Sequence, residues 1–162
     1  MMARRFEVVE VKDAEPFVGY LFERVFAAKP PDFPRHFVCL LHEGDGRIRV
    51  AGYAHFSRFE SVWLGGGLVV DKSIYPTVTR EELAGVGPNG SIGEFTVAEA
   101  IRQLGDDDPV LAYIGDPRSI IVNLNAGYVE THIPKIYAVW KRRFTPELER
   151  QICERVSRIA PF

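Results

Sequence analysis

The chain has 162 residues, of which 46% are hydrophobic and 26% are charged, and this predicts one globular domain over residues 1–162 with a core of its own. The formal net charge is −2, and the basic residues are scattered apart from Lys141-Arg142-Arg143. Binding to a nucleic-acid backbone needs a broad basic face, so we expect no nucleic-acid partner.

Several other kinds of site and location are also disfavoured. Cys39 and Cys153 are the only cysteines and lie far apart, and none of the four histidines is paired on a helix at ligand spacing. The pattern predicts neither a disulfide framework nor a metal site. The N-terminal residues lead into an alternating strand instead of an apolar secretory core, and no window is apolar enough to span a membrane. We therefore expect a cytoplasmic protein with no membrane partner.

The chain begins with a predicted strand and helix. Residues 6–12 alternate like a strand, and Asp13 can cap a helix that continues through Lys29 and ends at Pro30-Pro31. The apolar residues expected on the buried side of this helix are Phe17, Leu21, Val25 and Ala28.

Three strands are expected next. Residues 36–42 and 48–56 flank Glu43-Gly44-Asp45-Gly46, and Asp-Gly between two β-rich runs is a strong hairpin signal. A further strand spans residues 62–70. It is followed by a long irregular segment at 71–90, which contains a short helix that Thr79 caps and Gly85 ends. Such a segment is either a lid or specificity loop, or a solvated surface excursion.

A glycine-rich turn at 85–90 leads directly into a helix that starts near Ser91. Ser91 and Glu94 have capping-box spacing. The apolar stripe behind them consists of Ile92, Phe95, Ala98, Ile101 and Leu104. The first amides of a helix lie at the positive end of its dipole, and glycines let an anion approach them closely. The stretch therefore predicts either a phosphate cradle or a loop that needs positive φ values.

The same glycines allow a second interpretation. Gly85, Gly87 and Gly90 have the Gly-x-Gly-x-x-Gly spacing of a dinucleotide-binding fold. That fingerprint requires a strand to end at the first glycine, whereas residues 79–84 are predicted to be helical. A dinucleotide site is therefore disfavoured.

The last third of the chain completes the expected sheet. A turn at 105–109 precedes a buried strand at 110–114, and a helix at 118–126 ends at Gly127. Two strands, at 128–132 and 136–141, precede a helix that starts at Thr145-Pro146. The apolar stripe of that last helix is Leu148, Ile152, Val156 and Ile159. The whole order predicts an α/β (α+β) protein with one mixed central sheet and helices on both faces.

This order, with a glycine turn before the helix that follows the fourth strand, resembles the GNAT acyltransferase superfamily. Residues 66–71 resemble the end of the family's fourth strand, and residues 88–93 occupy the place of its Arg/Gln-x-x-Gly-x-Gly/Ala loop. Residues 116–128 are similar to its closing helix. The resemblance implies a single-domain GNAT-like fold that uses acetyl-coenzyme A (acetyl-CoA) or another acyl-CoA to acylate an amine of a small molecule or peptide. A homodimer is also compatible with it.

The resemblance also implies a set of cofactor-binding residues. Pantetheine would pair with the main chain of Leu68, Val69 and Val70, and the pyrophosphate would sit on the amides of Gly90, Ser91, Ile92 and Gly93. Ser119 and Asn123 would flank the pantetheine arm. Pro88 and Ser91 depart from the loop motif, and Asn123 aligns with a tyrosine that often protonates the departing thiolate. These departures leave a second interpretation open, a catalytically inactive GNAT-fold binding or regulatory module.

Acyl transfer to an amine needs a base for the ammonium group and a proton for the sulfur. Glu60 could act as a base through water, or be an exposed turn carboxylate. His55 titrates in the useful range, or packs in the core. Tyr113 could direct its hydroxyl at the thiolate, or pack as a core aromatic residue. These three residues are the candidate catalytic groups.

Overall fold

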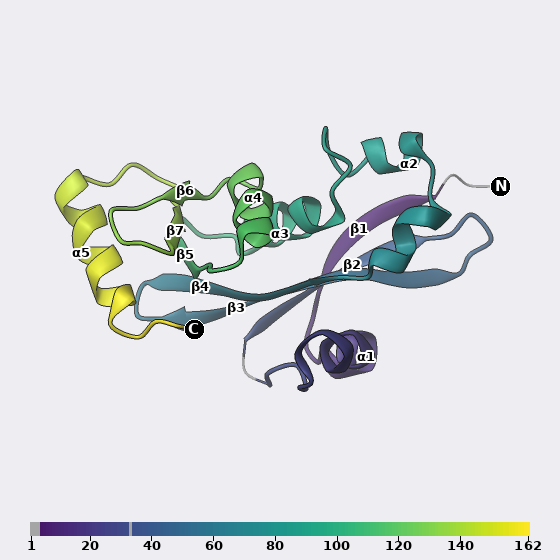
Figure 1. Cartoon of the computed structure of the whole chain (residues 1–162), viewed down its shortest axis with the longest axis horizontal. Coiled ribbons are helices and arrows are strands. Elements are labelled where there is room, and N and C mark those ends of the chain that lie inside the picture. Colours follow the sequence, from purple (N-terminus) through teal and green to yellow (C-terminus); the bar gives the residue numbers. More distant parts are fainter. Residues whose placement is uncertain (1–3, 33) are drawn as a thin grey trace.

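The computed structural model describes residues 4–32 and 34–162, so residues 1–3 and 33 of the predicted domain lie outside the described residues. The elements in chain order are β1 (Arg5–Val11), α1 (Glu15–Phe26), β2 (Arg35–His42), β3 (Ile48–Phe59), β4 (Val62–Val70), the 3-10 helix η1 (Lys72–Thr77), α2 (Arg80–Ala84), α3 (Ile92–Gln103), β5 (Val110–Tyr113), α4 (Pro117–Asn125), β6 (Val129–Glu130), β7 (Ile136–Val139) and α5 (Pro146–Ser157). Figure 1 shows this arrangement. The predicted order of strands and major helices is confirmed, and β6 and β7 are shorter than expected.

The strands form one mixed sheet in the order β1-β2-β3-β4-β5-β7-β6. Among the described residues only β4 and β5 are parallel, and they pair from Trp63–Val110 to Gly65–Ala112. Beyond Gly65 the two strands part, so no strand of the described chain lies beside the second half of β4 on that side. The α/β prediction of a mixed sheet with helices on both faces is therefore confirmed, and the parting leaves an opening beside β4.

A β-bulge lies in β4 just after the strands part. Tyr53 pairs with Val69 and His55 with Gly66, so β4 has one residue more than β3 over this interval. Gly67 adopts a φ of 59°, and a Cβ atom at this position would overlap the His55 ring. Only glycine fits both the backbone conformation and the space beside the ring.

The bulge changes the face to which β4 directs its side chains. Before it, Val62 and Leu64 pack in the core cluster of α5. After it, Val69 packs in the α1 cluster, whereas Leu68 and Val70 pack on the opposite face with α3. One inserted residue thereby directs Leu68 and Val70 toward the α3 and α4 side.

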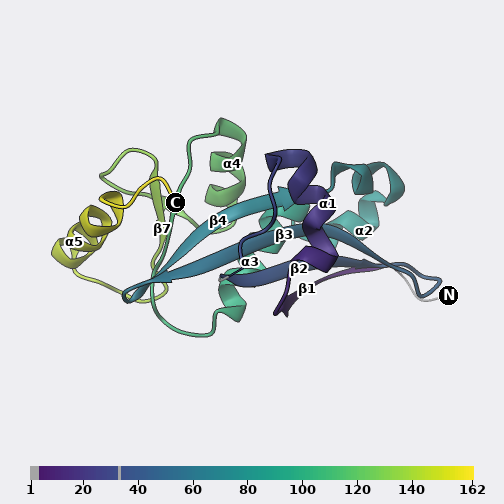
Figure 2. The ribbon, with the colours of Figure 1, turned by 90° about the horizontal axis from the view of Figure 1, so that it is seen from below.

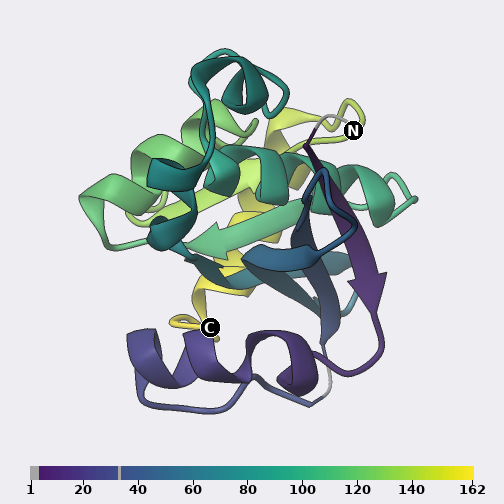
Figure 3. The same cartoon turned by 90° about the vertical axis from the view of Figure 1, so that its right-hand side faces the viewer.

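Helices cover both faces of the sheet (Figures 1 and 3). Helices α1 and α5 lie on one face, and Figure 2 shows α1 over β3 and β4 with α5 at the far end. Helices α2, α3 and α4 lie on the other face, where Ile92, Val97 and Ala100 of α3 pack against the sheet.

The predicted buried side of α1 is confirmed only at Leu21 and is wrong at its other three residues. Phe17 and Val25 are 38% and 52% exposed, and Ala28 lies beyond the helix and is exposed. The buried positions are Ala14, Val18, Leu21 and Phe22. The sequence carries two apolar stripes about one residue apart, and docking on Tyr53 and Val69 selects the second. The helix ends at Phe26, before the predicted Lys29, because Ala27 is left-handed with a φ of 49°.

The apolar stripes of α3 and α5 also differ in part from the prediction. In α3, Ala98 is exposed, whereas Thr96 and Val97 are buried. In α5, Leu148 is 39% exposed and Cys153 is buried. A single apolar periodicity cannot identify a small or polar residue that faces the sheet.

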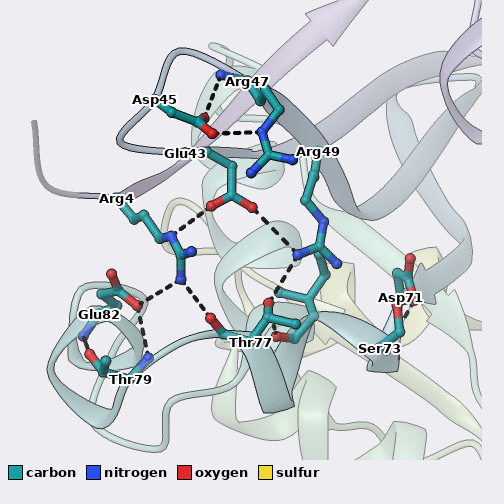
Figure 4. Close-up of polar contacts among 11 residues, drawn as sticks. Arg4, Glu43, Asp45, Arg47, Arg49, Asp71, Ser73, Thr77, Thr79 and Glu82 are labelled. Carbon is teal, nitrogen blue, oxygen red and sulfur yellow. Dashed lines mark hydrogen bonds and ion pairs between the residues drawn. The ribbon is translucent and has the colours of Figure 1, made fainter. Parts of the chain in front are cut away.

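The segment at 71–90 was predicted to be irregular apart from one short helix. It instead contains two helices, η1 and α2, and is anchored to the sheet. The capping box of α2 from Thr79 to Glu82 is present, and Ile74 is fully buried. Arg4 donates to the Thr77 carbonyl at 2.6 Å and pairs with Glu43 at 2.6 Å, as Figure 4 shows. Arg49 joins Glu43 to the Thr77 hydroxyl. The segment is therefore tied to the sheet and is not an irregular solvated excursion, and its role as a lid or specificity loop stays a prediction.

Candidate functional site

A cavity of about 270 Å³ lies where β4 and β5 part. Its lining comes from both parted strands, the loop after β5, α4, and the residue before β6, and includes Gly65, Gly66, Gly67, Leu68, Ala112, Tyr113, Gly115, Asp116, Ser119, Asn123 and Tyr128. Three successive glycines on β4 expose main chain to this space. The cavity can therefore hold an extended ligand against backbone groups.

A second cavity, of about 760 Å³, adjoins the first. The two share Phe26, Leu68, Asp116 and Ser119. The second is lined by the end of α1, the last three residues of β4, the start of η1 and the start of α4. Together the cavities follow the unpaired edge of β4 from Gly66 to Val70, a span of roughly 14 Å at the usual rise per residue.

Helix α4 presents polar groups to both cavities. The Asp116 carboxylate accepts hydrogen bonds from the Ser119 amide at 2.8 Å and the Ser119 hydroxyl at 3.0 Å, which caps the helix. The Ser119 amide hydrogen bond, followed by that of the hydroxyl, holds the pKa of Asp116 below its usual value. Asn123 is buried and donates to the Ser119 carbonyl at 2.8 Å. Asn123 thus braces α4, and its amide cannot supply a proton.

Tyr128 is the functional candidate that the sequence analysis missed. Its side chain is buried and lines the smaller cavity, and a Cβ atom on Gly65 would lie 2.6 Å from its hydroxyl. Within the described residues this hydroxyl has no hydrogen-bond partner. Burial raises the pKa of Tyr128, so the phenol stays protonated and can donate a hydrogen bond. The available signal was Gly127-Tyr128 where the resembling family has Gly-Phe.

Of the three predicted catalytic residues, Tyr113 lines the smaller cavity. It lies at the end of β5, just after the last residue pair with β4. The Lys135 ammonium lies 5.8 Å from the centroid of its ring. Tyr113 is thus at the site.

His55 lies behind the β4 bulge, on the α1 face of the sheet. Its ring packs against Phe22 and Tyr53, and its buried Nδ1 atom has no hydrogen-bond partner among the described residues. Burial, and then the positive charge of His36, lowers the pKa of His55 to about 4. It does not line either cavity, so its neutral ring supports the bulge from behind.

Glu60 lies at the opposite end of β4, in the turn that joins β3 to β4. It has a φ of 52°, and its Oε2 atom is 2.7 Å from Nη1 of Arg155 on α5. It lines neither cavity. The structure therefore does not bring Glu60 together with Tyr113.

The predicted cofactor-binding residues fall into two groups. Leu68, Val69, Val70 and Ser119 line the larger cavity, and Asn123 lines the smaller one. Gly90, Ser91, Ile92 and Gly93 line neither, although they lie close by. A Cβ atom on Gly93 would meet Val122 at 3.3 Å and Val70 at 3.4 Å. The loop therefore packs against the wall of the site from outside.

Gly85 follows α2 and not a strand, so the dinucleotide fingerprint lacks the structural context that it requires. Over residues 4–32 and 34–162 the structure has no cluster of three or more potential metal-ligating side chains. Within these same ranges no helix has the length and apolar character needed to cross a membrane.

The sequence matches no protein-family model and no curated protein. Two solved structures are similar to this chain. One is the ribosomal-protein-S18-alanine N-acetyltransferase from Escherichia coli, with a TM-score of 0.52, 11% identity, and coverage of 87% of this chain and 97% of that chain. The other is the KacTA–DNA complex, with a TM-score of 0.53, 15% identity, and coverage of 93% of this chain and 99% of that chain. Both matches extend over most of this chain and of the matched chain, and the chain has a GNAT-like fold.

Proposed function

We propose that the protein binds acetyl-CoA or another acyl-CoA and transfers the acyl group to an amine of a small molecule or peptide. The observation that carries this proposal is the pair of adjoining cavities along the unpaired edge of β4. The similarity to an N-acetyltransferase of the same fold supports it. The cofactor supplies the activated acyl thioester.

The free edge of β4 fits the pantetheine arm of such a cofactor. Main-chain amides and carbonyls of Leu68 and Val70 can pair with the amide groups of the arm, as an added strand would, whereas those of Val69 between them face β3. Ser119 and Asn123 flank the same path from α4. The arm would lead the thioester toward Gly65 and Ala112, where the two strands part.

The transfer forms a bond from nitrogen to the acyl carbon and breaks the bond from that carbon to sulfur. The nitrogen loses one proton, and the departing sulfur carries negative charge until it gains one. Tyr128 provides a buried hydrogen-bond donor for that charge. Its raised pKa makes it a donor that keeps its proton, so the proton that neutralises the sulfur comes from the amine or from water. Tyr113 is a second candidate donor.

Cofactor binding is tested by blocking the smaller cavity. Gly115 lines it, and a Cβ atom at this position has open space around it. We expect Gly115→Trp to weaken acetyl-CoA binding at least tenfold in calorimetric titration, because the indole would fill the mouth of the cavity. Acetyl-CoA at about 100 times its dissociation constant should stabilise the wild type by roughly 2.7 kcal/mol, and the variant far less.

The matched control is Asp107→Trp, which adds the same side chain to an exposed turn outside both cavities. Its affinity for acetyl-CoA should equal that of the wild type. Equal binding by Gly115→Trp and Asp107→Trp would place the cofactor elsewhere. Binding of CoA without acyl transfer to any amine would favour the inactive binding module.

The role of Tyr128 is tested with Tyr128→Phe, which removes only the hydroxyl. A hydrogen bond to a charged group is worth about 1.5–3 kcal/mol. We therefore expect the pKa of the thiol of bound CoA to rise by about one unit, measured from the ultraviolet absorbance of the thiolate. Acyl transfer should fall about tenfold, with CoA affinity unchanged. An unchanged thiol pKa would remove Tyr128 from this role, and Tyr113→Phe provides the parallel comparison.

A further inference from the structure

The start of α3, where the phosphate cradle was expected on the amides of Gly90–Gly93, is partly occupied: two of these four amides already donate to groups of the protein itself. The Gly90 amide donates to the Gly87 carbonyl at 3.1 Å, and the Ile92 amide donates to the Tyr75 hydroxyl at 3.0 Å. The Glu94 amide donates to the Ser91 hydroxyl at 3.2 Å. Ser91, which stands where the resembling loop has a glycine, thus caps its own helix. These three amides have no hydrogen left for a phosphate.

A carboxylate also lies at this helix start. Glu94 accepts a hydrogen bond from Asn89 at 3.1 Å and from Asn125 at 2.8 Å. Its negative charge compensates the positive end of the α3 dipole. A phosphate brought to the same place would lose that attraction and meet a like charge.

The larger cavity offers positive groups instead. Arg24, Lys72 and Arg118 line it, from the end of α1, the start of η1 and the start of α4. Asp71 and Asp116 also line it, but Asp71 pairs with Arg24 and accepts from Ser73, and Asp116 is held by Ser119. Throughout the described ranges, no ion pair joins Lys72 or Arg118 to a carboxylate. The cavity therefore has two cations available to an anionic ligand.

These cations lie at the outer end of the path along β4. Lys72 follows that strand by two residues, and Arg118 precedes Ser119, which lines both cavities. A pantetheine arm along Leu68–Val70 would thus carry its phosphate end into the larger cavity. An arginine fork and a lysine point charge are both well suited to phosphate oxygens.

We propose that Lys72 and Arg118 bind the phosphate groups at the end of the pantetheine arm, in place of the amides at the start of α3. This inference rests on the proposed function, because it assumes that the arm lies along β4. It assigns the ligand class as a phosphorylated pantetheine. CoA and 4′-phosphopantetheine share that chemistry and differ in the number of phosphates.

The test is calorimetric titration with three probes: CoA, 4′-phosphopantetheine, and pantetheine, which has no phosphate. We expect Lys72→Ala with Arg118→Ala to weaken CoA binding at least tenfold and to leave pantetheine binding unchanged. The loss for 4′-phosphopantetheine should be smaller than that for CoA if both cations contact the additional phosphates. The dependence of CoA affinity on salt concentration should also become shallower, because fewer charge contacts are made.

Two control variants make the result specific. Lys12→Ala with Arg80→Ala removes two exposed cations outside both cavities and should leave CoA affinity unchanged. Ser91→Asp keeps a good N-cap residue and adds a negative charge at the start of α3, and it should change CoA affinity less than twofold.

The titrations distinguish a wrong phosphate assignment from a wrong proposed function. If wild-type protein binds neither CoA nor pantetheine, the proposed function is wrong. If it binds CoA and the Lys72 and Arg118 variant binds it equally well, the phosphate assignment is wrong. A large loss of CoA affinity in Ser91→Asp alone would mean that the phosphates bind at Gly90–Gly93 and not at Lys72 and Arg118.

Discussion

Replacing Arg4 with Met should lower the free energy of unfolding by about 3 kcal/mol, because it leaves a buried carboxylate with one weaker partner. The Glu43 side chain is only 5% exposed, and the Arg4 Nε atom lies 2.6 Å from its Oε2 atom. Arg49 would stay 3.4 Å from the other carboxylate oxygen, which limits the loss. Urea unfolding followed by fluorescence measures the difference.

Two further variants distinguish the loss of the Arg4–Glu43 ion pair from the effect of removing any positive charge. Arg5 is 68% exposed and lies 3.8 Å from Glu7, so Arg5→Met should cost less than about 0.5 kcal/mol. Adding Glu43→Leu to Arg4→Met should restore part of the stability, because no unpaired buried charge is left. If Arg4→Met costs no more than Arg5→Met, the pair does not anchor the fold.

The same variant tests how the 71–90 segment is held. Arg4 reaches Thr77 on η1 and lies 3.8 Å from Glu82 on α2, so its loss removes contacts to both helices (Figure 4). We expect amide hydrogens of η1 and α2 to exchange faster in Arg4→Met, whereas those of α5 should not change. Unchanged exchange in η1 and α2 would mean that Arg4 does not hold the segment.

The chain order of the elements could be predicted because each carries a local signal. Asp45-Gly46 indicates the β2–β3 hairpin, and the caps at Thr79, Ser91 and Thr145 mark helix starts that the structure confirms. The face that a helix buries is not a local property. In α1 two stripes compete, and contacts with β3 and β4 choose between them.

The bulge and the site could be predicted only in part, since both depend on the register of β3 against β4. The run Gly65-Gly66-Gly67 indicates that main chain is exposed, but it does not indicate at which glycine the β-bulge lies. Tyr128 follows α4 by three residues, and the turn there sends its ring back to Gly65. Asn123 stands where the resembling family has a tyrosine, whereas the buried tyrosine that lines the cavity, Tyr128, lies five residues later.

Acid should destabilise the protein through His55. Its pKa is about 4 in the folded state against 6.5 for an ordinary histidine, because burial and the His36 charge oppose protonation. Above about pH 6.5 the ring is neutral in both states and the free energy of unfolding is unaffected. As the pH falls toward about 4, only the unfolded chain gains the proton, so stability falls by about 3 kcal/mol from this group.

His36 acts in the same direction, since burial lowers its pKa as well. The contribution of His55 is therefore isolated by substitution. His55→Leu and His55→Gln remove the titrating ring, and both should show a shallower loss of stability between about pH 6.5 and about pH 4 than the wild type. Urea unfolding at a series of pH values gives this slope independently of any constant cost of repacking beside Phe22 and Tyr53.

Agreement between the two variants matters because leucine and glutamine fill the space behind the bulge differently. A change of slope in only one of them would reflect packing against Gly67 and not titration. A wild-type slope in both would mean that His55 is protonated at the same pH in the folded and unfolded chain. In that case the neutral state assigned to the His55 ring would be wrong, whereas the steric reason for glycine at position 67 would stand, because it depends on the position of the ring and not on its charge.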